Sequence, residues 1–365
     1  VMMAPTEILA EQHYNTLKRF LSPLDINVDI LKGGLAEKER KKLLLKLKDG
    51  TVDVLVGTHA IIQEDVEFKK LGMVITDEQH RFGVKQRENL VKKGHCPDVI
   101  VMSATPIPRT IAMALYSDLD ISVIDTMPAG RQKVDTYVVN DSMRKRVYDF
   151  MASEVKKGHL VYVVCPAVEE NELEIINVEQ HTAYLRQEYP YLKIGMLHGK
   201  MKQDEKDKIL NQFLLKKIQV LVATTVVEVG VDVPFATLMI VENAERFGLA
   251  QLHQLRGRVG RSSLKSYCIL ISGSNQGTAR ERLNYLMNCY DGFKISQKDL
   301  ELRGPGEFLG VKQHGFFEFK FASFLDNTEI LKTTQKLANQ ILEERYLLLP
   351  EYKNLKKSLE TKICI

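Results

Sequence analysis

The sequence predicts an α/β protein with two parallel-sheet lobes followed by a helical region. From Val1 to about Asp125, short apolar runs alternate with amphipathic stretches. Proline and glycine interrupt this pattern between Thr126 and Arg131, and the alternation restarts beyond them and continues to Ser274. Strands that alternate with helices are typical of a parallel sheet covered on both faces. We therefore expect a first lobe over residues 1–127, a second over 128–274, and a C-terminal part of different design over 275–365.

In the first lobe, apolar runs predict strands over Val52–Val56, Met73–Thr76 and Val99–Met102, and amphipathic stretches predict helices over Glu7–Phe20, Glu37–Lys48 and Lys85–Lys92. The lysines of the second helix indicate a solvated face, because leucines recur on its other side. The chain opens on Val1, Met2 and Met3, which look like a strand without its preceding elements. We therefore expect the chain to be cut from a longer protein.

The second lobe repeats this architecture without repeating the sequence. Its apolar runs predict the strands Leu160–Val164, Ile194–Leu197, Val220–Ala223, Leu238–Val241 and Tyr267–Ile271, with helices such as Gln203–Lys216 between them. Beyond Ser274 the pattern favours helices over Thr278–Cys289 and Ile330–Tyr346. Between them, Asp299–Gly310 is rich in glycine and proline yet carries apolar residues, so we expect a packed loop.

Composition excludes several classes of protein and leaves others open. The 365 residues include 51 basic and 47 acidic side chains, a net charge of +4 that does not by itself indicate a nucleic-acid partner. No apolar run approaches the ~20 residues of a membrane helix, so we expect no membrane partner and a cytoplasmic protein. The five cysteines have no CxxC spacing and suggest neither a zinc site nor a disulfide framework.

Two adjacent carboxylates, Asp77 and Glu78, follow the short apolar run Met73–Thr76. That run has the form of a strand covered on both faces, and ligands of open α/β sheets bind beyond the carboxyl ends of such strands. An aspartate there can bind Mg²⁺, and a glutamate beside it can take a proton from an attacking water. A solvated acidic turn is the alternative interpretation.

Arginines separated by glycines form the segment Gln254–Arg261. Each glycine disfavours a helix by about 1 kcal/mol relative to alanine, but glycine allows close approach of guanidinium groups to a phosphate. Arg258 or Arg261 is therefore a candidate arginine finger for a nucleotide. Ion pairs with acids of the other lobe are the alternative. Further candidates follow strand-like runs, namely Ser103 and Thr105 with their hydroxyl groups, and Gly230 and Asp232.

Four segments resemble, in order, motifs II, III, V and VI of superfamily 2 helicases: they are DEQH, SATPIPRT, ATTVVEVGVDVP and QLHQLRGRVGR. Segments 4–7 and 57–60 resemble motifs Ia and Ib, which contact the nucleic-acid backbone in that family. Nearly the whole chain is similar to the RecG family of bacterial branched-DNA translocases. The specific marks are DEQHRFGVKQR (77–87) and DLELRGPGEFLGVKQHG (299–315), the latter similar to the family's translocation motif.

The resemblance implies two RecA-like lobes, the first truncated at its N-terminus, and a C-terminal helical hairpin, translocation loop and helical tail. It implies ATP and Mg²⁺ as cofactors, duplex and branched DNA as partners, a monomer, and single-stranded DNA-binding protein as a candidate partner. The resemblance also implies that Asp77 coordinates the metal and that Glu78 activates water. It implies that Gln79 and His80 couple the nucleotide to the other lobe. Gln254, Arg258 and Arg261 sense the γ-phosphate.

The remaining roles implied by the resemblance concern coupling and DNA. Ser103, Thr105, Gly230 and Asp232 belong to nucleotide coupling, and Arg303 and Gln313 to translocation. The implied DNA-binding residues are Pro5, Thr6, Thr58, His59, Thr224 and Thr225.

One departure from the family limits the activity expected of this chain. The sequence contains no GxxxxGK[ST] loop, whose N–H groups and lysine hold the phosphates of a nucleotide. We expect the loop to lie upstream, so that the parent is an ATP-driven motor and this chain alone hydrolyses little ATP. An RNA helicase, or a nucleic-acid-binding module without hydrolysis, remains an alternative.

Overall fold

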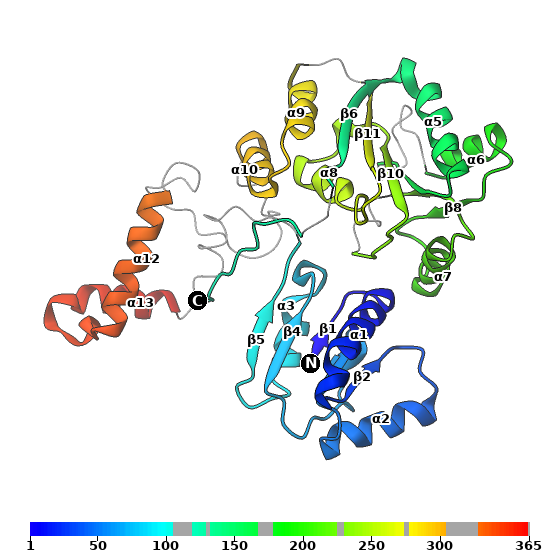
Figure 1. Ribbon diagram of the computed structural model, residues 1–365. Coiled ribbons are helices and arrows are strands. Elements are labelled where there is room, and N and C mark those ends of the chain that lie inside the picture. The colour runs from blue at the N-terminus through cyan, green and yellow to red at the C-terminus, as the bar shows by residue number, and fades with distance from the viewer. Residues whose placement is uncertain are drawn as a thin grey trace. The chain divides into compact units, whose positions relative to one another are not determined.

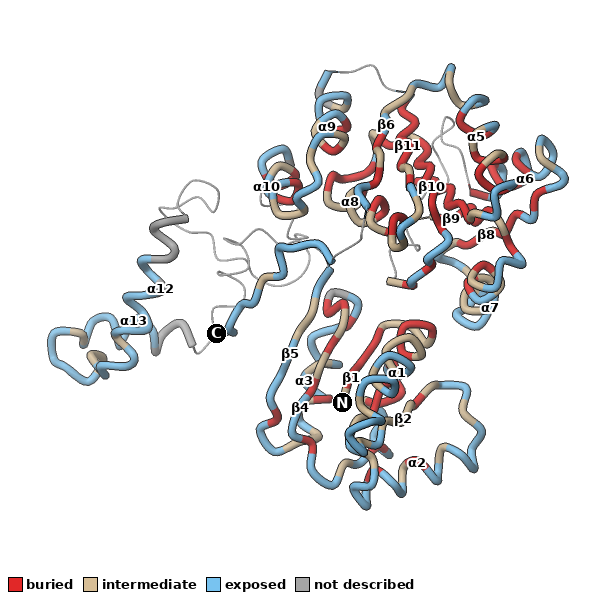
Figure 2. Tube along the Cα trace, in the orientation of Figure 1, coloured by how far each residue is buried: buried red, intermediate tan, exposed pale blue. Residues whose placement is uncertain are grey.

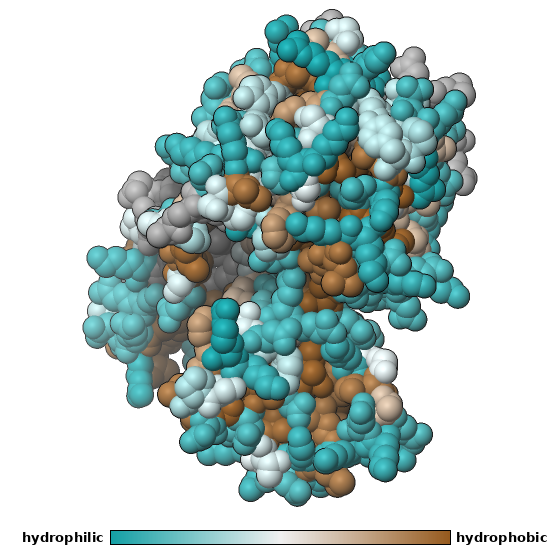
Figure 3. Space-filling view, turned by 45° about the vertical axis from the view of Figure 1, so that its right-hand side comes forward, coloured by the Kyte–Doolittle hydropathy of each residue, from teal (hydrophilic) through white to brown (hydrophobic). Residues whose placement is uncertain are grey.

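The computed structural model describes residues 1–104, 119–128, 132–166, 178–224, 230–273, 277–303 and 328–363. The chain divides into two compact units, Val1–Thr105 with Pro128–Tyr290, and Pro106–Met127 with Asp291–Ile365. Both sheets belong to the first unit, so the domain boundaries drawn from the sequence stay predictions. Within the described ranges, no helix has both the length and the apolar character needed to cross a membrane. The face seen in Figure 3 is largely hydrophilic, with smaller hydrophobic groups.

The first sheet has five parallel strands in the order β2-β3-β1-β4-β5 (Figure 1). Its strands are β1 (Met2–Met3), β2 (Val28–Leu31), β3 (Val54–Gly57), β4 (Met73–Thr76) and β5 (Asp98–Val101). Helix α1 (Glu7–Leu21) packs on one face through Leu9 and Ala10. Helices α2 (Glu37–Asp49) and α3 (Val84–Val91) pack on the other face through Leu43, Leu47 and Leu90. This confirms the predicted elements of the first lobe to within two residues at each end.

Register places the carboxyl ends of these strands at one edge. Met3 pairs with Gly57 on one side and with Thr76 on the other, and Thr76 pairs with Val101. The residues that follow the central strands are therefore brought together although they are far apart in sequence. They include Ala4, Thr58, Asp77 and Met102.

The strand before the acids is less covered than its apolar sequence predicts. Met73 is 42% exposed, and Val99 and Ile100 of β5 are 41% and 44% exposed. Figure 2 shows β5 exposed along most of its length, whereas β7 (Leu160–Val164) and β10 (Ala236–Val241) of the second sheet are buried. For β5 the reason is position, because it pairs with β4 alone among the described strands and forms an edge of the sheet.

The second sheet has six parallel strands in the order β6-β11-β10-β7-β9-β8. They are β6 (Asp135–Asn140), β7 (Leu160–Val164), β8 (Ile194–Leu197), β9 (Val220–Ala223), β10 (Ala236–Val241) and β11 (Tyr267–Ser272). The central strands β7 and β10 are buried at every position. Helices α5 (Arg144–Lys156) and α6 (Val178–Glu188) cover one face in a single apolar cluster. The described part of the lobe also contains the helices α7 (Gln203–Leu214) and α8 (Leu249–Arg256).

The C-terminal part is helical where it is described. Its helices are α9 (Gly277–Asn288), α10 (Gly292–Arg303), α12 (Thr328–Glu343) and α13 (Lys353–Ile363). The expected loop over 299–310 is wrong for its first part, since Asp299–Arg303 continue α10. Ile295, Ser296, Asp299 and Leu300 are all buried and recur at helical spacing, which explains why the helix extends this far. The rest of that expected loop lies outside the described residues.

Short 3₁₀ turns follow several of these elements. Among them, η2 (His59–Ile62), η3 (Gln79–Arg81) and η6 (Ala244–Arg246) come directly after β3, β4 and β10. They turn the chain at the carboxyl edge of each sheet, where the candidate site residues lie.

Candidate functional site

Asp77 is fixed at the carboxyl edge of the first sheet by contacts to both of its side-chain oxygens. Its backbone N–H donates to the carbonyl of Met3 at 2.9 Å, which continues the β1–β4 ladder by one residue. Its Oδ1 accepts from the Glu78 N–H at 2.9 Å, and its Oδ2 lies 2.8 Å from Nε2 of His13. Residue His13 belongs to α1 and was not singled out from the sequence.

Glu78 has a left-handed backbone, with φ 49° and ψ 54°. Such a conformation is uncommon for a residue other than glycine, and residues of this kind are enriched at active sites. The residue is 6% exposed, and its Oε2 accepts from the backbone N–H of Ala104 at 3.2 Å. One contact from this loop to the acids is thus a backbone contact, and the contacts expected of the Ser103 and Thr105 hydroxyl groups stay predictions.

Gln79 is held by two other segments. Its N–H donates to the carbonyl of Met102 at 3.1 Å, and its Oε1 accepts from Nη1 of Arg87 at 2.8 Å. Three successive side chains, Asp77, Glu78 and Gln79, are thus each held by a different part of the first lobe. The side chain of His80 and all of Thr105 lie outside the described residues.

The residues expected to contact DNA from the first lobe differ in accessibility. Thr6 is the N-cap of α1, and its Oγ1 accepts from the N–H of Leu9 at 3.4 Å. Thr58 is 2% exposed, and its hydroxyl has no hydrogen-bond partner within the described part of the chain. Neighbouring His59 is exposed, and Pro5 is half-buried. Of these candidates, His59 is the one presented to an external ligand.

The arginine segment begins in α8, which ends at Arg256 with Gly257 as its C-cap, as the glycines predict. Gly260 has φ 71°, and a Cβ there would lie 2.7 Å from Cγ2 of Val134, so this turn requires glycine. Arg258 is 5% exposed, and Gln254 is half-buried.

The second-lobe candidates lie close together. Nη1 of Arg261 is 3.5 Å from Oδ1 of Asp232, and a Cβ added to Gly230 would lie 3.5 Å from Nη1 of Arg258. Thr224 follows β9, and its N–H donates to the carbonyl of Leu197 at 3.1 Å. Thr225 lies outside the described residues.

Arg256, which the sequence interpretation did not select, links this segment to α9. It is 3% exposed, and its Nη1 and Nη2 donate to the carbonyls of Leu286 and Cys289 at 2.7 and 2.9 Å. Its guanidinium also lies 4.9 Å from the centroid of the Tyr290 ring. Burial lowers the pKa of Arg256 below its ordinary value. The translocation candidates are less defined, because Gln313 and the side chain of Arg303 lie outside the described residues.

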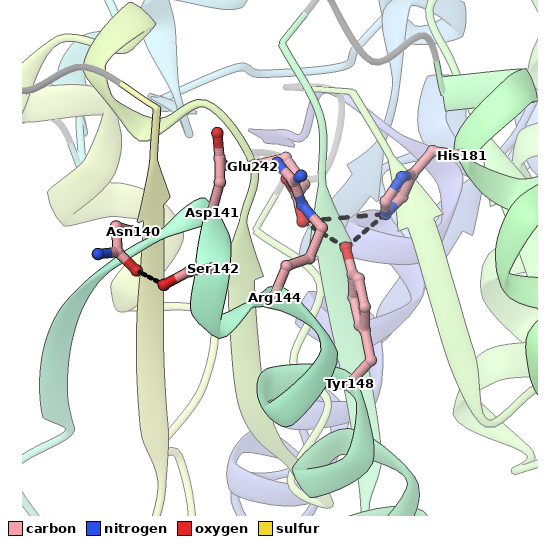
Figure 4. A network of polar contacts seen from close by, with 7 residues as sticks. All are labelled: Asn140, Asp141, Ser142, Arg144, Tyr148, His181 and Glu242. Carbon is pink, nitrogen blue, oxygen red and sulfur yellow. Dashed lines mark hydrogen bonds and ion pairs between the residues drawn. The ribbon is translucent and has the colours of Figure 1, made fainter.

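A buried polar network, centred on Glu242, stands at the carboxyl end of β10 (Figure 4). Tyr148 donates its hydroxyl hydrogen to Oε1 of Glu242, and Nε2 of His181 lies 2.6 Å from the same hydroxyl oxygen. Arg144 donates to Oε2 of Glu242 from Nε and Nη2 at 3.2 and 3.1 Å, and to Oδ1 of Asp141 at 2.8 Å. The network thus joins α5, α6 and β10 just before the turn that leads to α8.

The pKa shifts of the network follow from burial. Burial raises the pKa of the Tyr148 phenol well above its usual value. Burial also raises the pKa of Glu242, against the opposing effects of Tyr148 and Arg144. For His181, burial and then the charge of Arg144 lower the pKa to about 4. His181 is therefore neutral near pH 7, and its Nε2–H can donate to the phenol oxygen while the phenol donates to Glu242.

The surroundings of Asp77 indicate which kind of metal site this carboxylate could form. Within the described ranges, no group of three or more histidine, cysteine, aspartate or glutamate side chains could hold a metal ion. Mg²⁺ is usually bound by one or two carboxylates, with waters and substrate phosphates as its other ligands. The side chain of Asp77 is 19% exposed, so its carboxylate suits a site of that kind but not an all-protein cage. The four described cysteines are free.

Comparison with family models divides the chain into three parts. Residues 1–114 match the model described as DEAD/DEAH box helicase, and residues 142–263 match the helicase conserved C-terminal domain. Residues 289–362 match the model described as ATP-dependent DNA helicase RecG, domain 3, C-terminal.

Curated relatives extend this similarity over nearly the whole chain. ATP-dependent DNA helicase RecG of Bacillus subtilis (strain 168) is 47% identical over 361 residues, covering 98% of this chain and 53% of that protein. RecG of Thermotoga maritima is 48% identical over 341 residues, covering 93% of this chain and 44% of that protein. The chain therefore spans about half the length of the curated relatives it matches.

Solved structures agree. A structure of RecG bound to a three-way DNA junction is 45% identical, with a TM-score of 0.75, and covers 91% of this chain and 43% of that one. S. cerevisiae Dbp5 bound to RNA and ADP BeF3 is only 15% identical, with a TM-score of 0.57 over 82% of this chain and 80% of that one, and shows the fold alone. The two parallel sheets, the three family matches and the identity to these relatives agree, and the chain belongs to the RecG helicase family.

Proposed function

We propose that this chain supplies the two motor lobes of an ATP-dependent DNA helicase, or translocase, that acts on branched DNA in recombination and repair. Stalled replication forks and Holliday junctions are the substrates expected from the family. The observation that carries the proposal is the carboxyl edge of the first sheet, where Asp77, Glu78 and Gln79 are each held by a separate segment. The 45% identity to a RecG bound to a three-way junction supports the choice of branched DNA.

In the proposed site, Asp77 would hold Mg²⁺ bound to ATP, and Glu78 would take a proton from the attacking water. Bound Mg²⁺ would neutralise charge on the phosphates. Glu78 suits its role because its carboxylate is buried and fixed by the Ala104 N–H. Arg258 and Arg261, with Gln254, would contact the γ-phosphate, and an arginine finger of this kind typically contributes about 10³ to 10⁵ in rate.

Coupling between nucleotide and DNA is proposed for two groups of residues. The contact between Arg261 and Asp232, and the proximity of Gly230 to Arg258, support the first group in the second lobe. Gln79, His80, Ser103 and Thr105 would serve the same purpose in the first lobe. DNA contacts are proposed for Pro5, Thr6, Thr58, His59, Thr224 and Thr225, with His59 the most accessible, and translocation coupling for Arg303 and Gln313.

Arg256 adds a structural basis for transmission between the arginine segment and the helical region. Its two hydrogen bonds attach the end of α8 to the carbonyls at the end of α9. A shift of the arginines on nucleotide hydrolysis would therefore move α9. We propose Arg256 as a positioning residue in this link.

The sequence contains no GxxxxGK[ST] loop to hold the phosphates, so we propose that this chain by itself hydrolyses little or no ATP. Binding to DNA would depend mainly on phosphate contacts, fall steeply as salt rises and show little sequence preference. A monomeric, cytoplasmic protein with single-stranded DNA-binding protein as a partner is proposed from the family alone.

The test is ATP hydrolysis by a longer version that includes a phosphate loop. Activity is measured without nucleic acid and with linear duplex, a three-way junction or RNA, beside a Glu78→Gln control. Strong stimulation by the junction, absent in the control, is expected. Stimulation by RNA alone would move the function to an RNA helicase, and no stimulation by any nucleic acid would contradict the proposed motor.

A further inference from the structure

His13 lies against the carboxylate that the proposed function assigns to the metal. Its Nε2 is 2.8 Å from Oδ2 of Asp77, although the two residues are 64 positions apart in the sequence. The remaining oxygen of Asp77 accepts from the Glu78 N–H. Each carboxylate oxygen therefore has one contact on the protein side, which determines the direction in which its other lone pairs point.

We propose that His13 is a positioning residue for Asp77, which it orients toward the Mg²⁺–nucleotide complex. The proposal rests on the proposed function, since it takes Asp77 to be the residue that binds the metal. Residues that hydrogen-bond to a metal ligand fix its orientation, and their loss typically lowers metal affinity or activity about 10- to 100-fold.

The backbone around His13 is suited to this task. Helix α1 begins at Glu7, directly after the turn that follows β1, and its N-cap is closed by Thr6. Its first turn is buried against the sheet through Ile8, Leu9 and Ala10. His13 therefore stands on a rigid helix whose start is tied to the same central strand that pairs with β4.

The contact between His13 and Asp77 is partly buried, since the two side chains are 27% and 19% exposed. A hydrogen bond to a charged group typically contributes about 1.5–3 kcal/mol, so the contact can add to stability as well. An orienting role depends instead on where the carboxylate points, so its test needs readouts other than stability.

The contact itself can be tested on this chain by NMR. Long-range ¹H–¹⁵N spectra of the histidine rings show which ring nitrogen carries the proton, and the His13 signals are assigned with His13→Gln. A proton on Nε2 is expected, with ring signals that move in Asp77→Asn but not in Asp53→Asn, a control in the same lobe. A ring protonated on Nδ1 alone, or signals indifferent to Asp77→Asn, would overturn the proposal.

The role is tested on a longer version that includes the phosphate loop. His13→Ala removes the N–H, whereas the amide of His13→Gln can reach the position of Nε2. His13→Ala should lower kcat about 10- to 100-fold and raise the Mg²⁺ concentration needed for half-maximal rate, with DNA affinity unchanged. His13→Gln should recover most of both losses. Equal rates and equal Mg²⁺ dependence in all three proteins would refute positioning.

Binding of Mn²⁺ with ADP, followed by electron paramagnetic resonance, separates this proposal from the proposed function because it needs no hydrolysis. Weaker Mn²⁺ binding in His13→Ala, restored in His13→Gln, would support positioning even if the wild-type protein hydrolysed no ATP. Absence of ATP hydrolysis in the wild type would refute the proposed motor function but not the positioning role of His13. Unchanged Mn²⁺ binding in His13→Ala would refute positioning whether or not the protein hydrolyses ATP.

Discussion

Removal of the Tyr148 hydroxyl should destabilise the second lobe strongly, because that hydroxyl is a hydrogen-bond partner of two buried polar side chains. Glu242 is fully buried and His181 is 3% exposed, and both contact the phenol oxygen or its hydrogen. In Tyr148→Phe, Oε1 of Glu242 loses a donor and Nε2 of His181 loses an acceptor. A hydrogen bond to a charged group contributes about 1.5–3 kcal/mol, and a buried group left unsatisfied costs about 1–3 kcal/mol.

We therefore expect Tyr148→Phe to lower the free energy of unfolding by about 1.5–3 kcal/mol, the overlap of these ranges. For a lobe of this size that corresponds to a decrease of about 3–12 °C in Tm. The assay is thermal and urea unfolding followed by circular dichroism. Tyr184→Phe is the matched control, since Tyr184 lies beside the same rings but is 43% exposed. Equal stability of Tyr148→Phe and the wild type would refute the view that this network holds the lobe together.

The remaining predictions concern pH, the α8–α9 link and salt. The folded-state pKa of His181 is about 4, below its ordinary value of 6.5, so the unfolded chain takes up a proton first as pH falls. The contribution of neutral His181 to the free energy of unfolding is complete above about pH 6.5, and up to about 3 kcal/mol of it is lost as the pH falls toward 4. In urea unfolding at a series of pH values, His181→Gln should therefore lose less stability over this range than the wild type. Arg256→Ala should lower Tm by several degrees and increase hydrogen exchange in α9, whereas unchanged exchange would refute the link. Affinity of the chain for a three-way junction should fall steeply between 50 and 200 mM salt, and a flat response would contradict phosphate-dominated binding.

The second sheet shows which strands could be predicted from the sequence. Its four interior strands, β11, β10, β7 and β9, are nearly all buried and read as continuous apolar runs. Strands β2 and β6 were not predicted. Both are edge strands that include polar residues, such as Asp29 and Thr136, so their apolar pattern is weak.

The residues of the candidate site likewise fall into those that could be selected from the sequence and those that could not. Asp77 and Glu78, and Arg258 with Arg261, could be selected as candidates because the members of each pair lie within three residues of each other and follow a predicted strand or helix. His13, Arg87, Arg256 and Glu242 were not, because the partners described above lie between 8 and 98 positions away and only the fold brings them together. No local spacing in the sequence encodes contacts of this kind.

The most direct test of the motor is the unwinding of a labelled three-way junction by a longer version that includes a phosphate loop. The account predicts ATP-dependent release of the labelled strand by the wild-type protein and none by Glu78→Gln, with both binding the junction equally. Release without ATP, or equal release by Glu78→Gln, would contradict the assignment of hydrolysis to the carboxylates that follow β4.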